Sequence, residues 1–360
     1  MEGGNETSFE LQFMNADLRG KIEPDMLDQA GIDKVIIRSF KNSHPQGGLY
    51  FQNSFFNVIY PYLDELAGQL AGNRSKLDLW AWMISRKFDW TAEKRYFDYK
   101  YTNGKNGNGD GERQIVKKFD LFNPDAIKKV VGVFKQLAKK PIQGILIQDD
   151  LFFRHNEGFS NWGKAHFATN TSLPFRENLV LAPDTPYSQN WNRLKINQIN
   201  KVLRQVISAC KKVNPTIKIG MNIYYETPFF IERSEKWYSH NLREILLTGI
   251  DHIYLMSYHR QMKKEMKHND SKNKILFKQI VESAFAVCGD KLVVKLQLKD
   301  WETGALIPVE ELRDYLELIP KGVKRVCFMP VDIEDLNHIR QVVHTRIPAS
   351  PAPAIESTGE

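Results

Sequence analysis

The feature that most constrains the fold of this chain is the alternation of two kinds of segment along almost its whole length. Short apolar runs, rich in β-branched and aromatic residues, alternate with longer stretches of helical periodicity. Near-continuous apolarity is typical of parallel strands that are covered on both faces. Strands are therefore predicted at residues 9–16, 34–40, 77–85, 143–149, 218–225, 252–258, 292–298 and 325–330.

Helices are predicted between these strands. The clearest begins after Asn123, a favourable N-cap residue, with Pro124 at the first helical position. Its apolar face carries Val130, Val131, Phe134 and Leu137. Apolar stripes with the same spacing predict further helices at residues 199–210, 242–246, 275–285 and 309–318.

Eight strands that alternate with helices predict an α/β fold, a TIM-like (β/α)8 barrel, rather than an open doubly wound sheet. The first strand has the weakest pattern, so a seven-stranded barrel is the alternative. The length of 360 residues suits one barrel with loop insertions. We therefore expect a single barrel domain over residues 1–345 and a disordered tail over residues 346–360, which is rich in Pro and Ala.

Three connections are too long to be simple turns, and all three follow strands. They span residues 41–57, 86–122 and 151–190, after the second, third and fourth predicted strands. In barrels of this kind the loops at the carboxyl ends of the strands carry the functional residues. The sequence thus predicts an active site at the carboxyl ends of the strands.

Composition and charge exclude several classes of protein. The net charge is +7, but Lys and Arg are spread over amphipathic segments, which indicates solvated faces rather than a nucleic-acid surface. No apolar run reaches the roughly 20 residues needed to cross a bilayer, and the first residues show no signal-peptide pattern. Cys210, Cys288 and Cys327 lie far apart in apolar segments and are predicted to be buried thiols. The nine histidines form no metal-binding motif and no strand is followed by a Gly-rich phosphate loop, so neither a metal nor a cofactor is expected.

Polar and aromatic side chains dominate the predicted carboxyl ends of the strands. They are Asp17, Arg38, Trp82, Asp149 or Asp150, Asn222, Tyr224, Glu226, Tyr258, His259, Gln297, Asp300, Trp301 and Asp332. Sugar rings offer apolar faces that stack on aromatic rings and hydroxyls that pair with carboxylates and amides. This mixture therefore predicts a saccharide-binding site.

The pair Asp149-Asp150 is the sharpest single feature, because two acidic residues end an otherwise apolar strand. A partly desolvated carboxyl group there has a raised pKa and acts as a general acid on a glycosidic oxygen. Neighbouring side chains point to opposite faces, so we expect one aspartate to be the catalytic acid and the other its support. The alternative is structural: one aspartate caps the next segment and the other pairs with Arg154 or Arg38.

Glycoside hydrolysis usually needs a second group, either a nucleophile about 5 Å from the acid or a base about 6.5–9.5 Å from it. The candidates by position are Glu226, Asp300, Asp332 and Asp17. Each is also a plausible salt-bridge or cap residue. A reaction assisted by an N-acetyl group of the substrate needs no such nucleophile.

The chain resembles a known family in a series of short motifs that keep their order from about residue 32 to residue 333. These are Leu49-Tyr50-Phe51, Trp80-Ala81-Trp82-Met83 with Phe88-Asp89, Phe122-Asn123-Pro124-Asp125, residues 144–150, Trp191 with Lys195, Asn222-Ile223, residues 234–238, Leu296-Gln297 with Asp300-Trp301, and Met329-Pro330 with Asp332. The family is that of the C-terminal glycoside hydrolase domains of PgaB-type poly-β-1,6-N-acetyl-D-glucosamine deacetylases, which act in biofilm exopolysaccharide export.

The resemblance implies an endo-acting glycoside hydrolase whose groove binds partly deacetylated poly-β-1,6-N-acetylglucosamine or a related amino-sugar polymer. It implies that an aspartate of the Asp149-Asp150 pair is the acid and adds Phe51 to the expected substrate-binding residues. It also implies a periplasmic or extracellular location. The alternatives are a non-catalytic polysaccharide-binding barrel that assists export and an enzyme of another sugar class, such as an α-galactosaminidase-like barrel.

Two departures from the family pattern matter. The family usually has His before the acidic pair, where this chain has Gln148, which bears on rate and pH optimum. The metal-dependent deacetylase domain that precedes the module in the family is not part of this sequence, so no deacetylase activity is expected of this chain.

Overall fold

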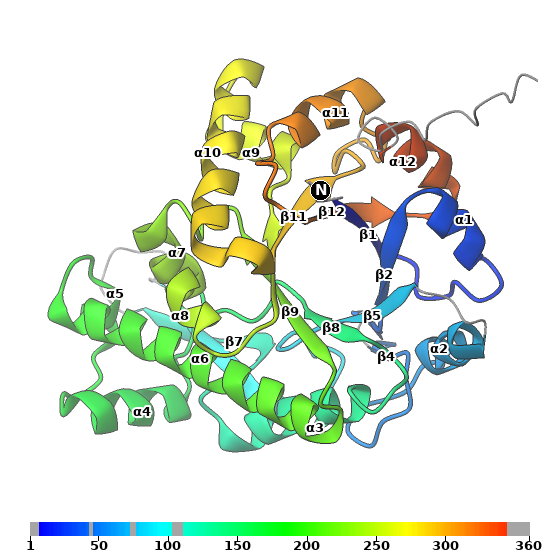
Figure 1. Ribbon diagram of the computed structural model, residues 1–360. Helices are drawn as coiled ribbons and strands as arrows, with labels where there is room; N and C mark the ends of the chain where they lie inside the picture. The colour runs from blue at the N-terminus through cyan, green and yellow to red at the C-terminus, as the bar shows by residue number, and fades with distance from the viewer. Residues whose placement is uncertain (1–6, 43–45, 73–76, 103–110, 344–360) are drawn as a thin grey trace, which may run out of the picture.

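The computed structural model describes residues 7–42, 46–72, 77–102 and 111–343. Eight parallel strands close into a barrel in the order β1-β12-β11-β10-β9-β8-β5-β2, seen end-on in Figure 1. The strands are β1 (Ser8–Phe13), β2 (Ile32–Arg38), β5 (Asp78–Met83), β8 (Gly144–Ile147), β9 (Lys218–Tyr224), β10 (His252–Met256), β11 (Leu292–Gln297) and β12 (Arg325–Val331). The TIM-like (β/α)8 prediction is confirmed with eight strands, and β1 closes the barrel by pairing with both β2 and β12.

Helices surround the barrel and cover its outer face (Figure 1). They are α1 (Pro24–Gln29), α2 (Tyr62–Gly72), α3 (Pro124–Leu137), α6 (Pro186–Val213), α7 (Ile231–Tyr238), α8 (Leu242–Leu246), α9 (His259–Met266), α10 (Asp270–Cys288), α11 (Val309–Glu317) and α12 (Leu336–Val343). Short 3-10 turns are η1 (Lys94–Tyr96), η2 (Gly289–Lys291) and η3 (Ile333–Asp335).

The helix predicted after Asn123 forms as expected. The Asn123 side chain accepts hydrogen bonds from the amides of Asp125 and Ala126, and Pro124 occupies the first turn. Val130, Phe134 and Leu137 are buried, whereas Val131 at the margin of the stripe is only partly buried.

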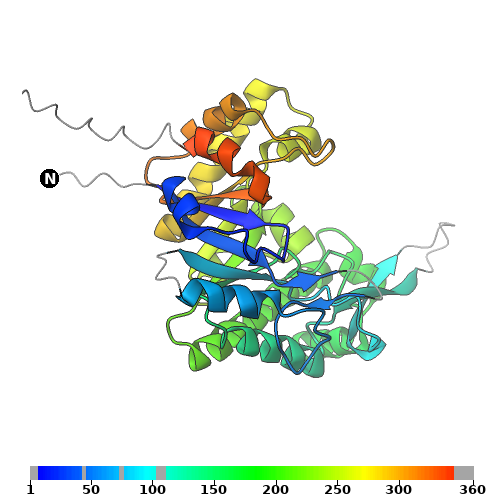
Figure 2. The same ribbon diagram turned by 90° about the vertical axis from the view of Figure 1, so that its right-hand side faces the viewer.

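The three long connections each contain secondary structure that the sequence analysis did not identify. After β2, the short strands β3 (Phe40–Lys41) and β4 (Gly48–Leu49) pair; after β5, β6 (Phe97–Thr102) and β7 (Glu112–Phe119) form an antiparallel hairpin. After β8, α4 (Asn161–Thr171) and α5 (Glu177–Leu181) precede α6. Figure 2 shows the hairpin, in cyan, projecting from the barrel at the side of the molecule.

The amino end of the barrel is filled by large side chains that two glycines accommodate. A Cβ atom at Gly144 would lie 2.2 Å from the Trp80 ring, and one at Gly220 would lie 2.6 Å from the Tyr254 ring. Glu10 accepts hydrogen bonds of 2.7 Å from both Lys34 and Tyr254 in the same layer. These contacts close the barrel below the carboxyl ends of its strands.

The cysteines, possible membrane spans, possible metal sites and the tail were also considered in the sequence. All three cysteines are buried free thiols, as predicted. Within the described ranges, no helix is long and apolar enough to span a bilayer, and no group of three or more His, Cys, Asp or Glu side chains is placed to hold a metal ion. The expected tail at residues 346–360 lies outside the described residues.

Candidate active site

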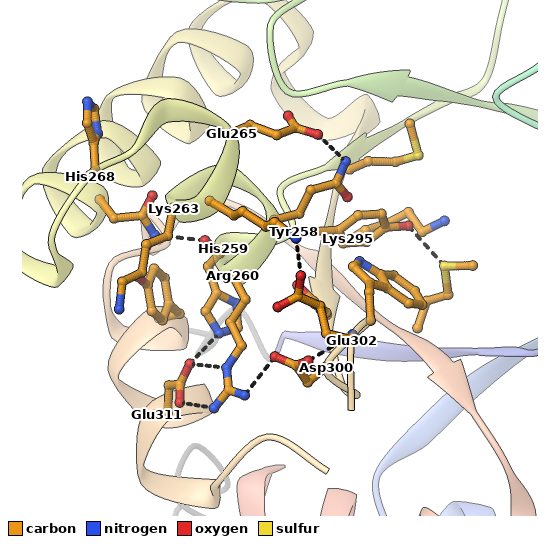
Figure 3. A pocket seen from close by; sticks show the side chains of 18 of the residues that line it. Tyr258, His259, Arg260, Lys263, Glu265, His268, Lys295, Asp300, Glu302 and Glu311 are labelled. Carbon is orange, nitrogen blue, oxygen red and sulfur yellow. Dashed lines mark hydrogen bonds and ion pairs between the residues drawn. The ribbon is translucent and has the colours of Figure 1, made fainter. Parts of the chain in front are cut away.

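A cavity of about 1630 Å³ opens at the carboxyl ends of the strands and continues between α9, α10 and α11. It brings together eight of the side chains predicted at the strand ends. These are Trp82, Asp149, Asn222, Tyr258, His259, Gln297, Asp300 and Trp301. Figure 3 shows the part of the wall formed by α9, the loop after β11 and α11.

Asp149 lies two residues after the end of β8, and its carboxyl group lines the cavity at the barrel mouth. The Tyr224 hydroxyl lies 3.3 Å from Asp149 Oδ2 and 3.2 Å from the main-chain oxygen of Asp149. Burial, together with the negative charge of Asp150, raises the pKa of Asp149, although Lys295 and the Tyr224 hydroxyl act in the opposite sense. A raised pKa suits a carboxyl group that must carry a proton before it reacts.

Asp150 points away from the cavity and holds the turn after β5. Its two carboxylate oxygens accept hydrogen bonds from the amides of Ser85, Arg86 and Lys87 at 2.7–3.1 Å, and from the Ser85 hydroxyl at 2.7 Å. Both oxygens are therefore occupied as acceptors of structural hydrogen bonds. Of the two aspartates, Asp149 lines the cavity and Asp150 holds the loop after β5.

Tyr224 is fixed by a further layer of side chains. Its ring stacks on Tyr238 with centroids 4.1 Å apart and an interplanar angle of 12°. The Tyr238 hydroxyl in turn donates a hydrogen bond of 3.1 Å to Glu226. Glu226, predicted to bind substrate, is thus a buried residue outside the cavity that anchors Tyr238.

Lys295 is a cavity residue that the sequence analysis missed. It lies on β11, and its Nζ donates hydrogen bonds of 2.8 Å to Asn222 Oδ1 and 2.6 Å to Gln12 Oε1. Burial lowers the pKa of Lys295 to about 8. A signal was present: Lys295 is the one charged residue within residues 292–298, two positions before Gln297 and hence on the same strand face.

An aromatic wall stands on the side of the cavity formed by β10 and β11. Trp301 is 44% exposed, and its ring meets the ring of buried Tyr258 edge-on, with centroids 5.6 Å apart. A large exposed ring beside a polar cavity offers a flat surface for the apolar face of a sugar.

The loop that carries Trp301 is held by charged side chains. Arg260 donates two hydrogen bonds to the carboxylate of Glu311, at 2.9 and 2.6 Å, and a third to Asp300 at 2.9 Å (Figure 3). The hydrogen bond from Arg260 is the main reason that the pKa of Asp300 falls to about 2 and that of Glu311 to about 2. His259 adds a contact of 3.0 Å to Glu311. Asp300 is therefore an ionised anchor of the loop rather than a proton donor.

Several residues predicted to bind substrate do not line the cavity. Phe51 is fully buried in the hydrophobic core, so this prediction was wrong: the apolar segment after β4 packs inward. Asp332 forms an ion pair of 2.6 Å with Lys299. The guanidinium group of Arg38 lies over the Phe40 ring at 4.9 Å and near the Trp82 ring at 5.9 Å, and Arg38 is not among the residues that line the cavity.

The four candidates for a second catalytic carboxylate all have structural partners. They are Asp17 with Arg19, Glu226 with Tyr238, Asp300 with Arg260, and Asp332 with Lys299. The site thus presents the Asp149 carboxyl group, whose pKa is raised, in a wide cavity with amide and aromatic walls. Such an arrangement is suited to protonating the oxygen between two sugar units.

The fold of the chain is similar to that of several solved glycosidases. The PgaB (BpsB) glycoside hydrolase domain from Bordetella bronchiseptica aligns with a TM-score of 0.76 and 19% identity, over 94% of this chain and 99% of that domain. The β-galactosidase Gan42B of G. stearothermophilus aligns with a TM-score of 0.66 and 12% identity, over 96% of this chain and 57% of that enzyme. The β-galactosidase from Marinomonas ef1 aligns with a TM-score of 0.63 and 10% identity, over 90% of this chain and 54% of that enzyme. No match was found among curated proteins.

The barrel and the cavity at its carboxyl end define a TIM-barrel protein with the fold of these solved glycosidases. The sequence of residues 14–329 matches the profile of hypothetical glycosyl hydrolase family 13. The chain belongs to that family, and its resemblance to the PgaB glycoside hydrolase domain is confirmed.

Proposed function

We propose that the chain is an endo-acting hydrolase of partly deacetylated poly-β-1,6-N-acetylglucosamine, or of a closely related amino-sugar polymer, with Asp149 as the general acid. The observation that carries the proposal is the placement of Asp149: it stands at the barrel mouth with a raised pKa, while Asp150 is held by four donors behind it. The polymer is proposed from the likeness to the PgaB domain.

The cavity supports an internal cut rather than removal of terminal units. It continues from Asp149 past Trp301 to the crevice between α9, α10 and α11, and its volume of about 1630 Å³ exceeds what one sugar unit fills. A chain-like substrate therefore has room on the outer side of the cleaved bond.

The attacking group is the acetamido oxygen of the substrate in this proposal. The four carboxylates that qualified by position are bonded to structural partners, which favours assistance by the substrate over an enzymic nucleophile. Asp149 gives its proton to the leaving glycosidic oxygen while the acetamido oxygen attacks the anomeric carbon; water then opens the cyclic intermediate. The product keeps the β configuration, which proton NMR of fresh digests detects.

Location and additional activities follow the same proposal. A polymer of this kind lies outside the cytoplasm, so we place the protein in the periplasm or outside the cell. Removal of acetyl groups is not part of the proposed activity, and measurement of free acetate during digestion tests this point.

The test is digestion of the partly deacetylated polymer, followed by mass spectrometry of the soluble products. Wild-type protein should release short oligomers, and Asp149→Asn should lower the rate by about 10²–10⁴-fold because it cannot donate the proton. Asp290→Asn is the matched control, since Asp290 lies in η2 at the amino end of the barrel. Undiminished activity of Asp149→Asn contradicts the assignment of the acid. Polymer binding without any released product supports the alternative of a non-catalytic polysaccharide-binding barrel that assists export.

A further inference from the structure

Lys295 occupies a position that is unfavourable for a lysine without a ligand. It is 1% exposed, and its Nζ donates to two neutral oxygens, Asn222 Oδ1 and Gln12 Oε1. Among the described residues it forms no ion pair, and the negative charges of Asp149 and Glu10 act on it only at longer range. A buried ammonium without an anionic partner is costly, and such groups gather at functional sites.

The hydrogen bonds to Lys295 fix the orientation of two amides. An ammonium group only donates, so Asn222 and Gln12 both turn their oxygen toward Nζ and their NH2 group away from it. The Asn222 NH2 group donates to the main-chain oxygen of Ile147 at 3.2 Å. The NH2 group of Gln12, a fully buried residue, has no hydrogen-bond partner within the described part of the chain.

The result is a cluster of donors at the inner end of the cavity. Lys295 and Asn222 both line the cavity, as does Asp149. Figure 3 shows Lys295 beside Tyr258, and its Nζ lies 5.9 Å from the centre of the Tyr258 ring. Within the described part of the chain, two of the three N–H bonds of Lys295 have hydrogen-bond partners, which leaves one for a further acceptor. Two strands supply the lining residues, β9 and β11, so the cluster is rigidly placed.

We propose that Lys295 is a substrate-binding residue that donates a hydrogen bond to an oxygen of the sugar unit lying deepest in the cavity, beside Asp149. The inference deepens the proposed function and rests on it for the identity of the sugar. The acceptor is a hydroxyl or amide carbonyl oxygen, because an ammonium can pair with either. Gln12 is a positioning residue behind it, since it holds Nζ but does not line the cavity.

The first experiment measures binding in the absence of turnover. A β-1,6-linked N-acetylglucosamine pentamer is titrated calorimetrically into Asp149→Asn protein and into the same protein with Lys295→Met added. Loss of a hydrogen bond to a charged donor should weaken binding roughly ten- to hundredfold. Methionine has similar length and no charge, so the packing of the strand is retained.

A matched control and a second variant guard against a merely structural effect. Lys291 lies at the amino end of β11 and donates to the main-chain oxygen of Ile250, so Lys291→Met should leave pentamer affinity unchanged. Lys295→Gln keeps an NH2 donor and should recover part of the affinity. Thermal melting confirms that each variant is folded, and if Lys295→Met does not fold, Lys295→Gln decides.

The outcomes separate this inference from the proposed function. Wild-type cleavage with equal pentamer affinity in folded Lys295→Met and parent proteins overturns the role of Lys295 alone. Lost affinity in Lys295→Met, with no cleavage by the wild type, supports the role of Lys295 and overturns the hydrolase. A pentamer whose acetamido groups are replaced by free amines distinguishes a carbonyl acceptor from a hydroxyl, because only the carbonyl contact disappears in it.

Discussion

The Tyr224 hydroxyl lies 3.3 Å from Oδ2 of Asp149, and this contact couples the acid to the layer of aromatic side chains behind it. A hydroxyl that donates to a carboxylate stabilises the ionised form, so Tyr224 lowers the pKa of Asp149 against the effect of burial. The balance between burial, which raises the pKa, and the Tyr224 hydrogen bond, which lowers it, determines the pH above which Asp149 loses its proton.

Tyr224→Phe is expected to move the pH profile of cleavage. The variant removes the hydroxyl, so the pKa of Asp149 rises further above its usual range. A general acid works in its protonated form; hence the decline of kcat/KM with rising pH should move to higher pH. The measurement is kcat/KM between pH 4 and 9, with Tyr187→Phe on α6 as the control variant. An unshifted profile in a folded variant contradicts Asp149 as the acid that limits the rate.

Asp150→Asn is expected to act on stability. The carboxylate accepts from three amides and the Ser85 hydroxyl, and an asparagine NH2 group would face some of these donors. Loss of buried, charge-assisted hydrogen bonds should lower the free energy of unfolding by about 2–4 kcal/mol. Ser85→Ala, which removes only one donor, should cost about 1 kcal/mol. Chemical denaturation of the two variants measures both losses of unfolding free energy. A smaller loss for Asp150→Asn than for Ser85→Ala contradicts the structural role of Asp150.

The barrel was predictable because its strands depend on local patterns. A run such as residues 292–298 is apolar enough to identify a strand buried on both sides, whatever it packs against. The hairpin β6–β7 was not predicted, because residues 112–118 of β7 are mostly exposed and charged. Its position depends on tertiary contacts instead: buried Arg86 bonds Asp98 on β6 and Glu157 after β8.

The part of the candidate site that lies at the carboxyl ends of the strands could be predicted from the sequence. Asp149, Asn222 and Tyr258 reach the cavity because the carboxyl ends of parallel strands meet. Phe51 and Glu226 lie beyond strand ends in segments whose direction depends on tertiary packing, so position along the sequence did not predict their burial. The sequence likewise did not show which aspartate faces the cavity, because the donors around Asp150 come from residues 85–87 in the loop after β5.

Trp301→Ala should weaken polymer binding with little effect on the chemical step. The ring is exposed on the cavity wall and meets Tyr258 edge-on, so its loss removes a stacking surface but no group next to the cleaved bond. We expect KM to rise about three- to tenfold with kcat nearly unchanged. Trp162 on α4 is similarly exposed, at 50% against 44% for Trp301, but lies outside the cavity, and Trp162→Ala should leave KM unaltered. Equal effects of the two substitutions are incompatible with a role of Trp301 in binding.

Lys295 should make the stability of the protein depend on pH in an unusual direction. Burial lowers the pKa of Lys295 to about 8 in the folded state, whereas the unfolded chain keeps the usual value near 10.5. Between these values the unfolded state binds more protons, so the lysine's contribution to stability rises as pH increases from about 8 toward 10.5 and is constant at its least favourable level below that window.

Lys295→Met removes this contribution. Relative to the variant, the wild type should gain up to about 3 kcal/mol of unfolding free energy between pH 7 and 10. The comparison needs both proteins, because buried Lys195, whose pKa is lowered to about 7, contributes a rise of the same sign. Denaturant unfolding at pH 7, 8, 9 and 10 measures the difference. If the difference in unfolding free energy between wild type and Lys295→Met does not change with pH, Lys295 keeps its ordinary pKa. Water or an ion then reaches the Lys295 ammonium group in the folded protein.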